Sequence, residues 1–187
     1  MKFPKILFFL FLLQIHDAQL DAYLDYKSPF HPTISGNGMV VSQNLESSKI
    51  GTMILESGGN AVDAAVAVGF SLTTTLPRAG NIGGGGFMLV YIKETEELFS
   101  IDYRSRSSLN SNLEDLFGSK SPAQIQDDDY DLTKYDYKAS AVPGTVYGLL
   151  EAHERFGDLP LEKVLQPVID QARNGIIVSY DLHNAIG

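Results

Sequence analysis

Four consecutive glycines, Gly83–Gly86, lie within the stretch GNIGGGGFMLVYI, and glycine-rich stretches are one pattern that binds phosphate. A phosphate-binding loop needs lysine and serine or threonine after its last glycine, and then a helix. Here Phe87 follows the glycines and opens an apolar run typical of a strand. A dinucleotide site needs the order strand, glycines, helix. The pattern argues against nucleotide binding and predicts that the glycines turn the chain sharply and let another backbone segment pack closely.

Arg104 ends the segment LFSIDYR, which is predicted to be a strand. Strand alternation places Phe99, Ile101 and Tyr103 on one face, and Leu98, Ser100, Asp102 and Arg104 on the other. A guanidinium group offers a planar fork of donors that suits bidentate binding of a carboxylate. The residues alone leave two interpretations open for Arg104, a carboxylate ligand or a local ion pair with Asp102, and they favour the ion pair.

Other residues with reactive side chains lack the partners that catalysis or metal binding needs. Thr73–Thr75 end an apolar helix with no base nearby, so helix packing is their predicted role. His153, between Glu151 and Glu154, is expected to be solvated. The aspartates of QDDDYD, residues 126–131, lack the spacing and turn glycine of a calcium loop and predict a solvated acidic loop.

Two helices are predicted before the glycines. Residues 45–56 have an apolar face formed by Leu45, Ile50, Ile54 and Leu55. Asn60 and Asp63 have the spacing of a capping box for a second helix, AVDAAVAVGFSLTTT, which is apolar almost all round. A helix without a polar face is expected to be buried on several sides.

Strands and further helices complete the predicted elements. GMVVSQ, residues 38–43, is a strand candidate, and FMLVYI is a strand expected to be covered on both faces and to form a hairpin with LFSIDYR. Residues 105–138 are polar and predict a surface excursion. Two helices follow, and Pro167 inside the second predicts a kink or a break.

The composition limits the classes of protein to which this chain can belong. The chain has 187 residues, 44% of them hydrophobic, which is enough for one domain with a core. A formal net charge of -9 disfavours nucleic acid and anionic membranes as partners. The absence of cysteine excludes disulfides, thiolate nucleophiles and cysteine-based metal sites.

Residues 1–20 predict a secretory signal peptide, because two lysines precede an unbroken apolar run, Ile6–Leu13, that is too short to span a membrane. We therefore expect a periplasmic or secreted protein whose domain begins at residue 21. An uncleaved membrane anchor remains the alternative.

The ordered blocks of this chain resemble the N-terminal part of the large subunit of gamma-glutamyltranspeptidases, also called glutathione hydrolases. The matching blocks cover most of residues 37–178: GMVVSQ, ILESGGNAVDAAVAVGFSL, LPRAGNIGGGGFMLVYI, IDYR, AVPGTVYGL and LPLEKVLQPVIDQARNGIIV. GGNAVDAAVA together with GNIGGGGFML is the most specific of these signals.

The resemblance implies an α+β fold, the four-layer αββα sandwich of N-terminal-nucleophile hydrolases, of which residues 21–187 are only the N-terminal portion. Members are made as a precursor, or zymogen, that cleaves itself into two subunits. The new N-terminal threonine of the small subunit attacks γ-glutamyl donors such as glutathione, and the acyl-enzyme is resolved by water or by an amino acid or dipeptide. The resemblance implies no metal or cofactor.

In the family, the arginine of the I-D-x-R block binds the α-carboxylate of the donor, and it corresponds to Arg104. The family commonly has glutamate after this arginine, whereas this chain has Ser105 and then Arg106. The nucleophile belongs to the missing small-subunit portion, so no catalytic residue is assigned here and the chain alone is expected to be inactive. A related cephalosporin acylase, acting on glutaryl amides, and a non-catalytic remnant of the fold are the alternatives.

Overall fold

A computed structural model of the chain describes residues 33–126 and 136–186. The chain divides into two compact units, Met1–Asn37 and Gly38–Gly187, and the described part of the first has no helix or strand. The predicted signal peptide and the aspartates of residues 127–131 lie outside the described residues, so both remain predictions.

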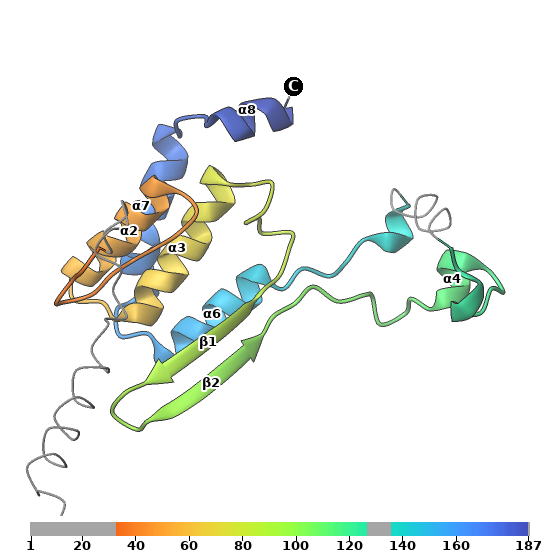
Figure 1. Cartoon of the computed structure of the whole chain (residues 1–187), viewed down its shortest axis with the longest axis horizontal. Coiled ribbons are helices and arrows are strands. Elements are labelled where there is room, and N and C mark those ends of the chain that lie inside the picture. The colour runs from red at the N-terminus through yellow and green to blue at the C-terminus, as the bar shows by residue number, and fades with distance from the viewer. Residues whose placement is uncertain (1–32, 127–135, 187) are drawn as a thin grey trace, which may run out of the picture. The chain divides into compact units, whose positions relative to one another are not determined.

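Four helices form the core of the second unit, and α3 contacts each of the other three. They are α2 (Leu45–Glu56), α3 (Ala61–Thr75), α6 (Thr145–Phe156) and α7 (Leu161–Asn174). The small side chains of α3 allow its neighbours to approach closely, and Val66 and Ala67 are completely buried. The prediction that this helix is buried on several sides is confirmed (Figure 1).

The predicted capping box starts α3. The side chain of Asn60 accepts hydrogen bonds from the backbone N–H groups of Val62 and Asp63, at 2.8 and 3.0 Å. The carboxylate of Asp63 in turn accepts the backbone N–H of Asn60 at 3.0 Å. These bonds satisfy donors that a helix N-terminus otherwise leaves without partners.

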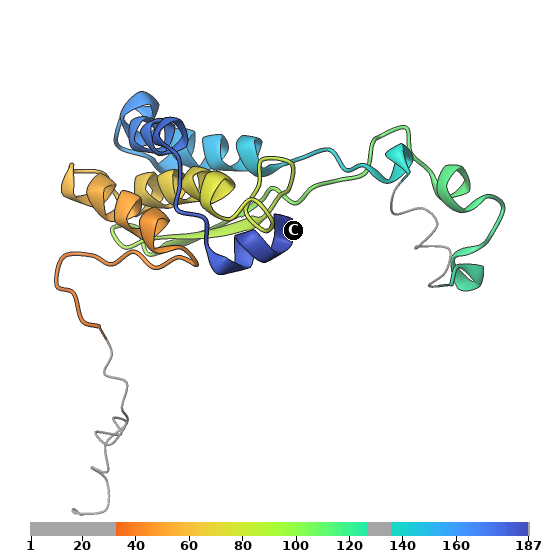
Figure 2. The same ribbon diagram turned by 90° about the horizontal axis from the view of Figure 1, so that it is seen from above.

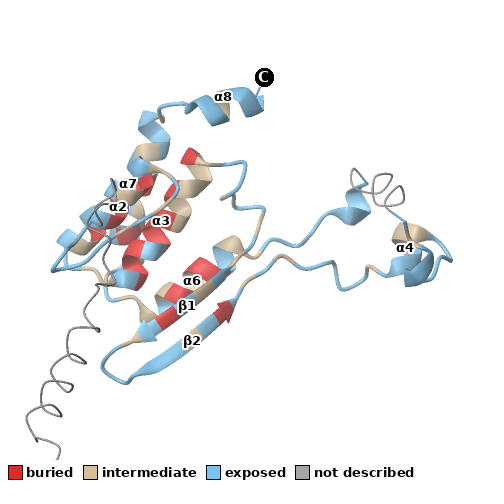
Figure 3. Cartoon of the chain, viewed as in Figure 1, coloured by how far each residue is buried: buried red, intermediate tan, exposed pale blue. Residues whose placement is uncertain are grey.

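The two strands β1 (Phe87–Ile92) and β2 (Glu97–Asp102) form the predicted antiparallel hairpin, with Phe87 opposite Asp102 and Ile92 opposite Glu97. Its inner face lies against the helices (Figure 2), where Val90 and Ile101 are buried. The apolar residues of its outer face are between 60% and 71% exposed: Phe87, Leu89, Tyr91 and Leu98. Within the described chain, β1 is therefore covered on one face and not on the two that were expected (Figure 3).

The remaining helical elements of the described chain are short. They are α4 (Leu113–Phe117), the 3₁₀ turns η1 (Pro122–Gln124) and η2 (Tyr137–Ala139), and α8 (Tyr180–Ile186). The polar excursion predicted for residues 105–138 leaves and rejoins the core at one isolated antiparallel bridge, between Arg106 and Val142. No helix in the described part of the chain is both long and apolar enough to cross a membrane.

Two local predictions were wrong, and a third was wrong in part. GMVVSQ is not a strand, because a strand needs a hydrogen-bonded partner and the described strands β1 and β2 pair with each other. Leu45 is 70% exposed and does not belong to the buried face of α2. Of the kink or break predicted at Pro167, the break does not occur, because α7 runs continuously from Leu161 to Asn174, and the kink stays a prediction. The segregated helices and antiparallel hairpin agree with the predicted α+β class.

A candidate anion-binding pocket beyond the hairpin

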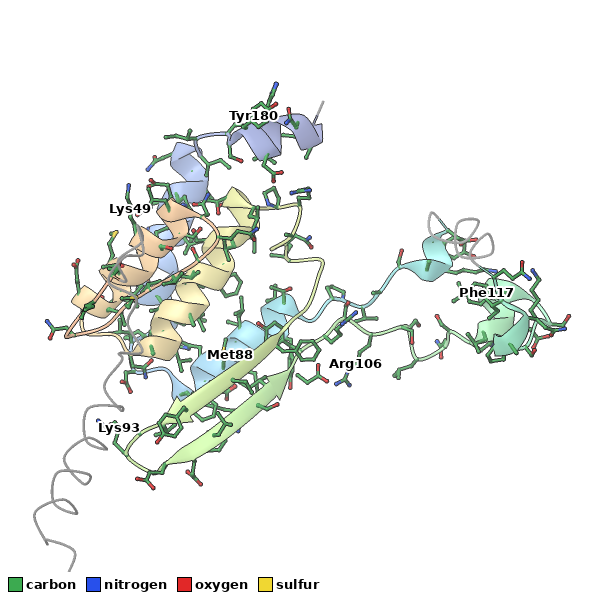
Figure 4. All side chains as sticks on the ribbon, in the orientation of Figure 1. Lys49, Met88, Lys93, Arg106, Phe117 and Tyr180 are labelled. Atoms are coloured by element: carbon green, nitrogen blue, oxygen red, sulfur yellow. The ribbon has the colours of Figure 1, made fainter. Side chains whose placement is uncertain are left out.

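A pocket with a volume of about 340 Å³ lies where the chain leaves β2 and where it enters α6. Its lining consists of Asp102, Tyr103, Arg104, Arg106, Val142, Pro143, Gly144 and Tyr147. Two segments that are distant in sequence therefore form it. Arg106 is labelled just beyond the end of β2 in Figure 4.

Arg104 lines this pocket with an exposed side chain. Its backbone N–H donates to the carboxylate of Asp102 at 3.0 Å, so that carboxylate is turned back toward the main chain. The ion pair with Asp102 that the residues alone favoured does not form, and no ion pair among the described residues includes the Arg104 guanidinium. The fork of donors is thus available to a ligand in the pocket.

The glycine run holds the segment that carries Arg104 from one side. Gly86 and Tyr103 exchange backbone hydrogen bonds of 3.3 and 3.1 Å, which extend the hairpin ladder beyond β1 and β2. A Cβ atom on Gly85 would overlap the backbone nitrogen of Ser105 and lie 2.6 Å from the carbonyl oxygen of Tyr103. The predicted close packing is confirmed. A sharp turn through positive φ is not, because none of Gly83–Gly86 has a positive φ.

Gly144, the N-cap residue of α6, and Gly148 within α6 contact the same segment from the other side. A Cβ atom on Gly144 would overlap the carbonyl oxygen of Tyr103, and one on Gly148 would overlap the Tyr103 ring. The backbone N–H groups of Gly144 and Thr145 donate to the carbonyl of Gly84 at 2.8 and 3.2 Å. Sequence reasoning missed this contact, although two glycines four residues apart share one helix face and signal a close approach.

Tyr103 connects these contacts to the pocket. Its side chain is half-buried against the glycines of both segments. Burial raises the pKa of the Tyr103 phenol above its ordinary value of 10.0, because the charged phenolate is disfavoured away from water. The phenol is therefore neutral at physiological pH, and the arginines carry the positive charge of the pocket.

Thr73–Thr75 belong to helix packing, as predicted. Thr75 and Ser71 each lie within hydrogen-bonding distance of the buried hydroxyl of Ser47, at 2.9 and 2.8 Å. Ser71 and Thr74 both donate to the side-chain oxygen of Gln171, at 2.8 and 3.1 Å. This hydroxyl cluster joins α2, α3 and α7 and places no base beside a threonine.

His153 is not solvated, contrary to the prediction. Its side chain is only 13% exposed, and its Nε2 atom lies 2.8 Å from the carbonyl oxygen of Leu159 and 3.6 Å from the carboxylate of Asp63. Asp63 is completely buried. Among the described residues, no three histidine, cysteine, aspartate or glutamate side chains gather where they could hold a metal ion.

Comparison with known proteins assigns the family and the fold of this chain. Residues 47–187 match the sequence model of the family described as gamma-glutamyltranspeptidase. A solved gamma-glutamyltranspeptidase from Pseudomonas nitroreducens, complexed with L-DON, superposes with a TM-score of 0.70 and 38% identity over 82% of this chain and 44% of its own. The fold is therefore the N-terminal portion of an N-terminal-nucleophile hydrolase, as predicted. The chain belongs to the gamma-glutamyltranspeptidase family.

Curated relatives give the same assignment. The glutathione hydrolase proenzyme of Escherichia coli K12 is 41% identical over 150 residues, which are 80% of this chain and 25% of the relative. The acylase ACY 1 proenzyme of Pseudomonas sp. strain V22 is 34% identical over 167 residues, 87% of this chain and 29% of the relative. The chain thus spans about a quarter of the length of the curated relatives that it matches.

Proposed function

We propose that this chain is the N-terminal part of a γ-glutamyl acyltransferase and hydrolase acting on glutathione and related γ-glutamyl compounds. The family assignment supports the reaction class, and a glutathione hydrolase proenzyme is among its relatives. One observation carries the proposal for this chain. Arg104 presents a guanidinium group with no ion-pair partner among the described residues, at a pocket whose backbone is held by glycines on two sides.

Arg104 binds the α-carboxylate of the γ-glutamyl donor in this proposal. A guanidinium fork can donate two parallel hydrogen bonds to the two carboxylate oxygens, which fixes the orientation of the donor as well as its position. Among the described residues, Asp102 forms no ion pair with the guanidinium, and its carboxylate instead accepts the backbone N–H of Arg104. The fork then holds the donor while chemistry occurs at the γ-carbonyl.

The nucleophile of the proposed reaction is the N-terminal threonine of the small-subunit portion. Its hydroxyl oxygen attacks the γ-carbonyl carbon while its own α-amine accepts the proton, and the amine of the leaving part departs with a proton. The resulting ester is cleaved by water, or by the amine of an amino acid or dipeptide. The present chain alone is inactive in this proposal, since it contributes donor binding and no nucleophile.

The outer face of the hairpin favours a longer protein, because its apolar residues are exposed in this chain. Phe87, Leu89, Tyr91 and Leu98 form an exposed apolar surface on it, which is unusual for a face that stays in water. In the proposal, the remaining part of the precursor covers this surface.

The proposed protein is exported, on the strength of residues 1–20. A periplasmic or secreted location follows if that segment is removed, and membrane attachment follows if it stays. N-terminal sequencing of the mature protein separates the two outcomes.

The experiment that tests the proposed function is the substitution Arg104→Lys in the protein expressed from its complete gene. Lysine keeps the charge and cannot offer the fork, so kcat/KM for γ-glutamyl donors should fall by roughly tenfold or more. Arg173→Lys, the same change at an exposed position outside the pocket, is the matched control and should keep the wild-type value. Unchanged donor kinetics in Arg104→Lys would rule out the assigned role.

Two other functions can be tested with the same protein and its gene. Similarity to an acylase proenzyme favours hydrolysis of glutaryl amides as the second candidate, and turnover of glutaryl amides in preference to γ-glutamyl amides would establish it. An in-frame stop codon directly after the codon for Gly187 would instead support a non-catalytic remnant.

A further inference from the structure

Arg106 is a second arginine at the pocket, and nothing in the proposed function uses it. Its side chain is exposed, lines the pocket together with Arg104, and takes part in no ion pair among the described residues. The backbone of Arg106 is fixed independently of its side chain. It exchanges hydrogen bonds of 3.1 and 2.7 Å with the backbone of Val142.

The segment from Tyr103 to Arg106 alternates between the protein interior and the pocket. Tyr103 and Ser105 are partly buried, and Ser105 approaches the backbone of Gly85, whereas Arg104 and Arg106 are exposed. Two side chains that are two positions apart in an extended segment point to the same side, with Cα atoms roughly 7 Å apart. The two guanidinium groups therefore place two neighbouring positive charges at one pocket.

The charges around this pocket favour a ligand with two anionic groups. Among the described residues that line the pocket, Asp102 is the only acidic one against two arginines, and its carboxylate accepts the backbone N–H of Arg104. The start of α6 lines the same pocket through its N-cap residue Gly144 and through Tyr147, and the partial positive charge at a helix N-terminus also favours an anion. A single carboxylate on Arg104 would leave Arg106 without a counter-charge.

We propose that Arg106 is a specificity-determining residue that binds a second carboxylate, located on the leaving part of the γ-glutamyl donor. This inference rests on the proposed function, in which Arg104 binds the α-carboxylate. The pocket then selects donors whose leaving part is anionic over otherwise equal donors whose leaving part is neutral.

The test compares γ-glutamylglycine with γ-glutamylglycinamide, two donors that differ only in the charge of the terminal group. In Arg106→Gln, the ratio of kcat/KM for the acid to kcat/KM for the amide should fall by about tenfold, the scale of one lost charge-assisted hydrogen bond. Arg106→Lys should retain an intermediate ratio, because it keeps the charge. A general loss of positive potential would also lower the ratio in Arg106→Gln, since the acid carries one more negative charge than the amide, but it would leave Arg106→Lys at the wild-type ratio.

The outcomes separate this inference from the proposed function. Arg104→Lys should lower kcat/KM for both donors and preserve their ratio. An unchanged ratio in Arg106→Gln, with both donors still turned over, overturns the role of Arg106 alone. Failure of the wild-type protein to use either donor overturns the proposed function and this inference together.

Discussion

The ring of Tyr103 lies against the backbone of Gly148 so closely that a Cβ atom at position 148 would overlap it. The overlapping atoms include Cβ and Cγ, at the base of the tyrosine side chain, so rotation of the outer ring cannot relieve the contact. Tyr103 directly precedes Arg104. The contact between α6 and Tyr103 therefore determines where the guanidinium group is presented.

Gly148→Ala should lower the free energy of unfolding by about 1–3 kcal/mol, the usual cost of an added group in a packed contact. Alanine is the better helix former by about 1 kcal/mol, which acts in the opposite direction. We expect the overlap to dominate, because the backbones of Gly144 and Thr145 are tied to Gly84 and restrict movement of the helix. Urea unfolding followed by far-UV circular dichroism measures the difference.

Gly36→Ala is the control for this substitution, because a Cβ atom there would meet nothing within 4 Å. It should change the free energy of unfolding by less than about 0.5 kcal/mol. A Gly148→Ala protein more stable than the wild type would show that helix propensity outweighs the contact with Tyr103.

Much of the fold could be predicted because its signals are local. The helix predicted for residues 45–56 has the bounds of α2, and the capping box of Asn60 and Asp63 starts α3 as expected. Alternation in LFSIDYR placed Ile101 in the core and Arg104 on the polar face. Caps and apolar periods involve residues within a few positions of each other, so the sequence displays them directly.

The remaining features depend on contacts between distant segments. The burial of His153 comes from Leu159 and from Asp63, which is 90 positions earlier in the chain. GMVVSQ has the composition of a strand but no strand partner in the described structure. The sequence does not decide whether the Arg104 guanidinium has an ion-pair partner, because the Asp102 carboxylate could bind either that guanidinium or the backbone N–H of Arg104.

Asp63→Asn should destabilise the protein strongly. The buried carboxylate accepts backbone N–H groups from Asn60, Asp158 and Leu159, at distances between 3.0 and 3.2 Å, and so joins the start of α3 to the connection between α6 and α7. An amide in its place turns an N–H₂ group toward these donors and leaves some of them without an acceptor. We expect a loss of about 2–4 kcal/mol in the free energy of unfolding, measured by urea denaturation.

Asp158→Asn is the matched control for Asp63. The change in chemistry is the same, but the Asp158 side chain is exposed and only its backbone N–H binds Asp63. The free energy of unfolding should stay within about 0.5 kcal/mol of the wild-type value. Equal losses in the two variants would contradict a special role for the buried carboxylate.

Alkaline pH should destabilise the protein through Tyr103. Burial raises the pKa of this phenol in the folded state above its ordinary value of 10.0, so the folded protein keeps the proton at a pH where the unfolded chain has begun to release it. The unfolded state then binds fewer protons, and the free energy of unfolding decreases with rising pH. This contribution is fully present below pH 10 and is lost as the pH rises through the folded-state pKa.

Tyr103→Phe isolates this contribution, because phenylalanine fills the same space beside Gly148 and cannot ionise. The variant should lose less stability than the wild type between neutral pH and a pH above 10, in urea unfolding series run at each pH. Tyr180→Phe, which removes an exposed hydroxyl from α8, should keep the wild-type dependence on pH. If Tyr103→Phe and the wild type lose stability equally above pH 10, the burial of Tyr103 between the glycines of the hairpin segment and of α6 does not control its ionisation.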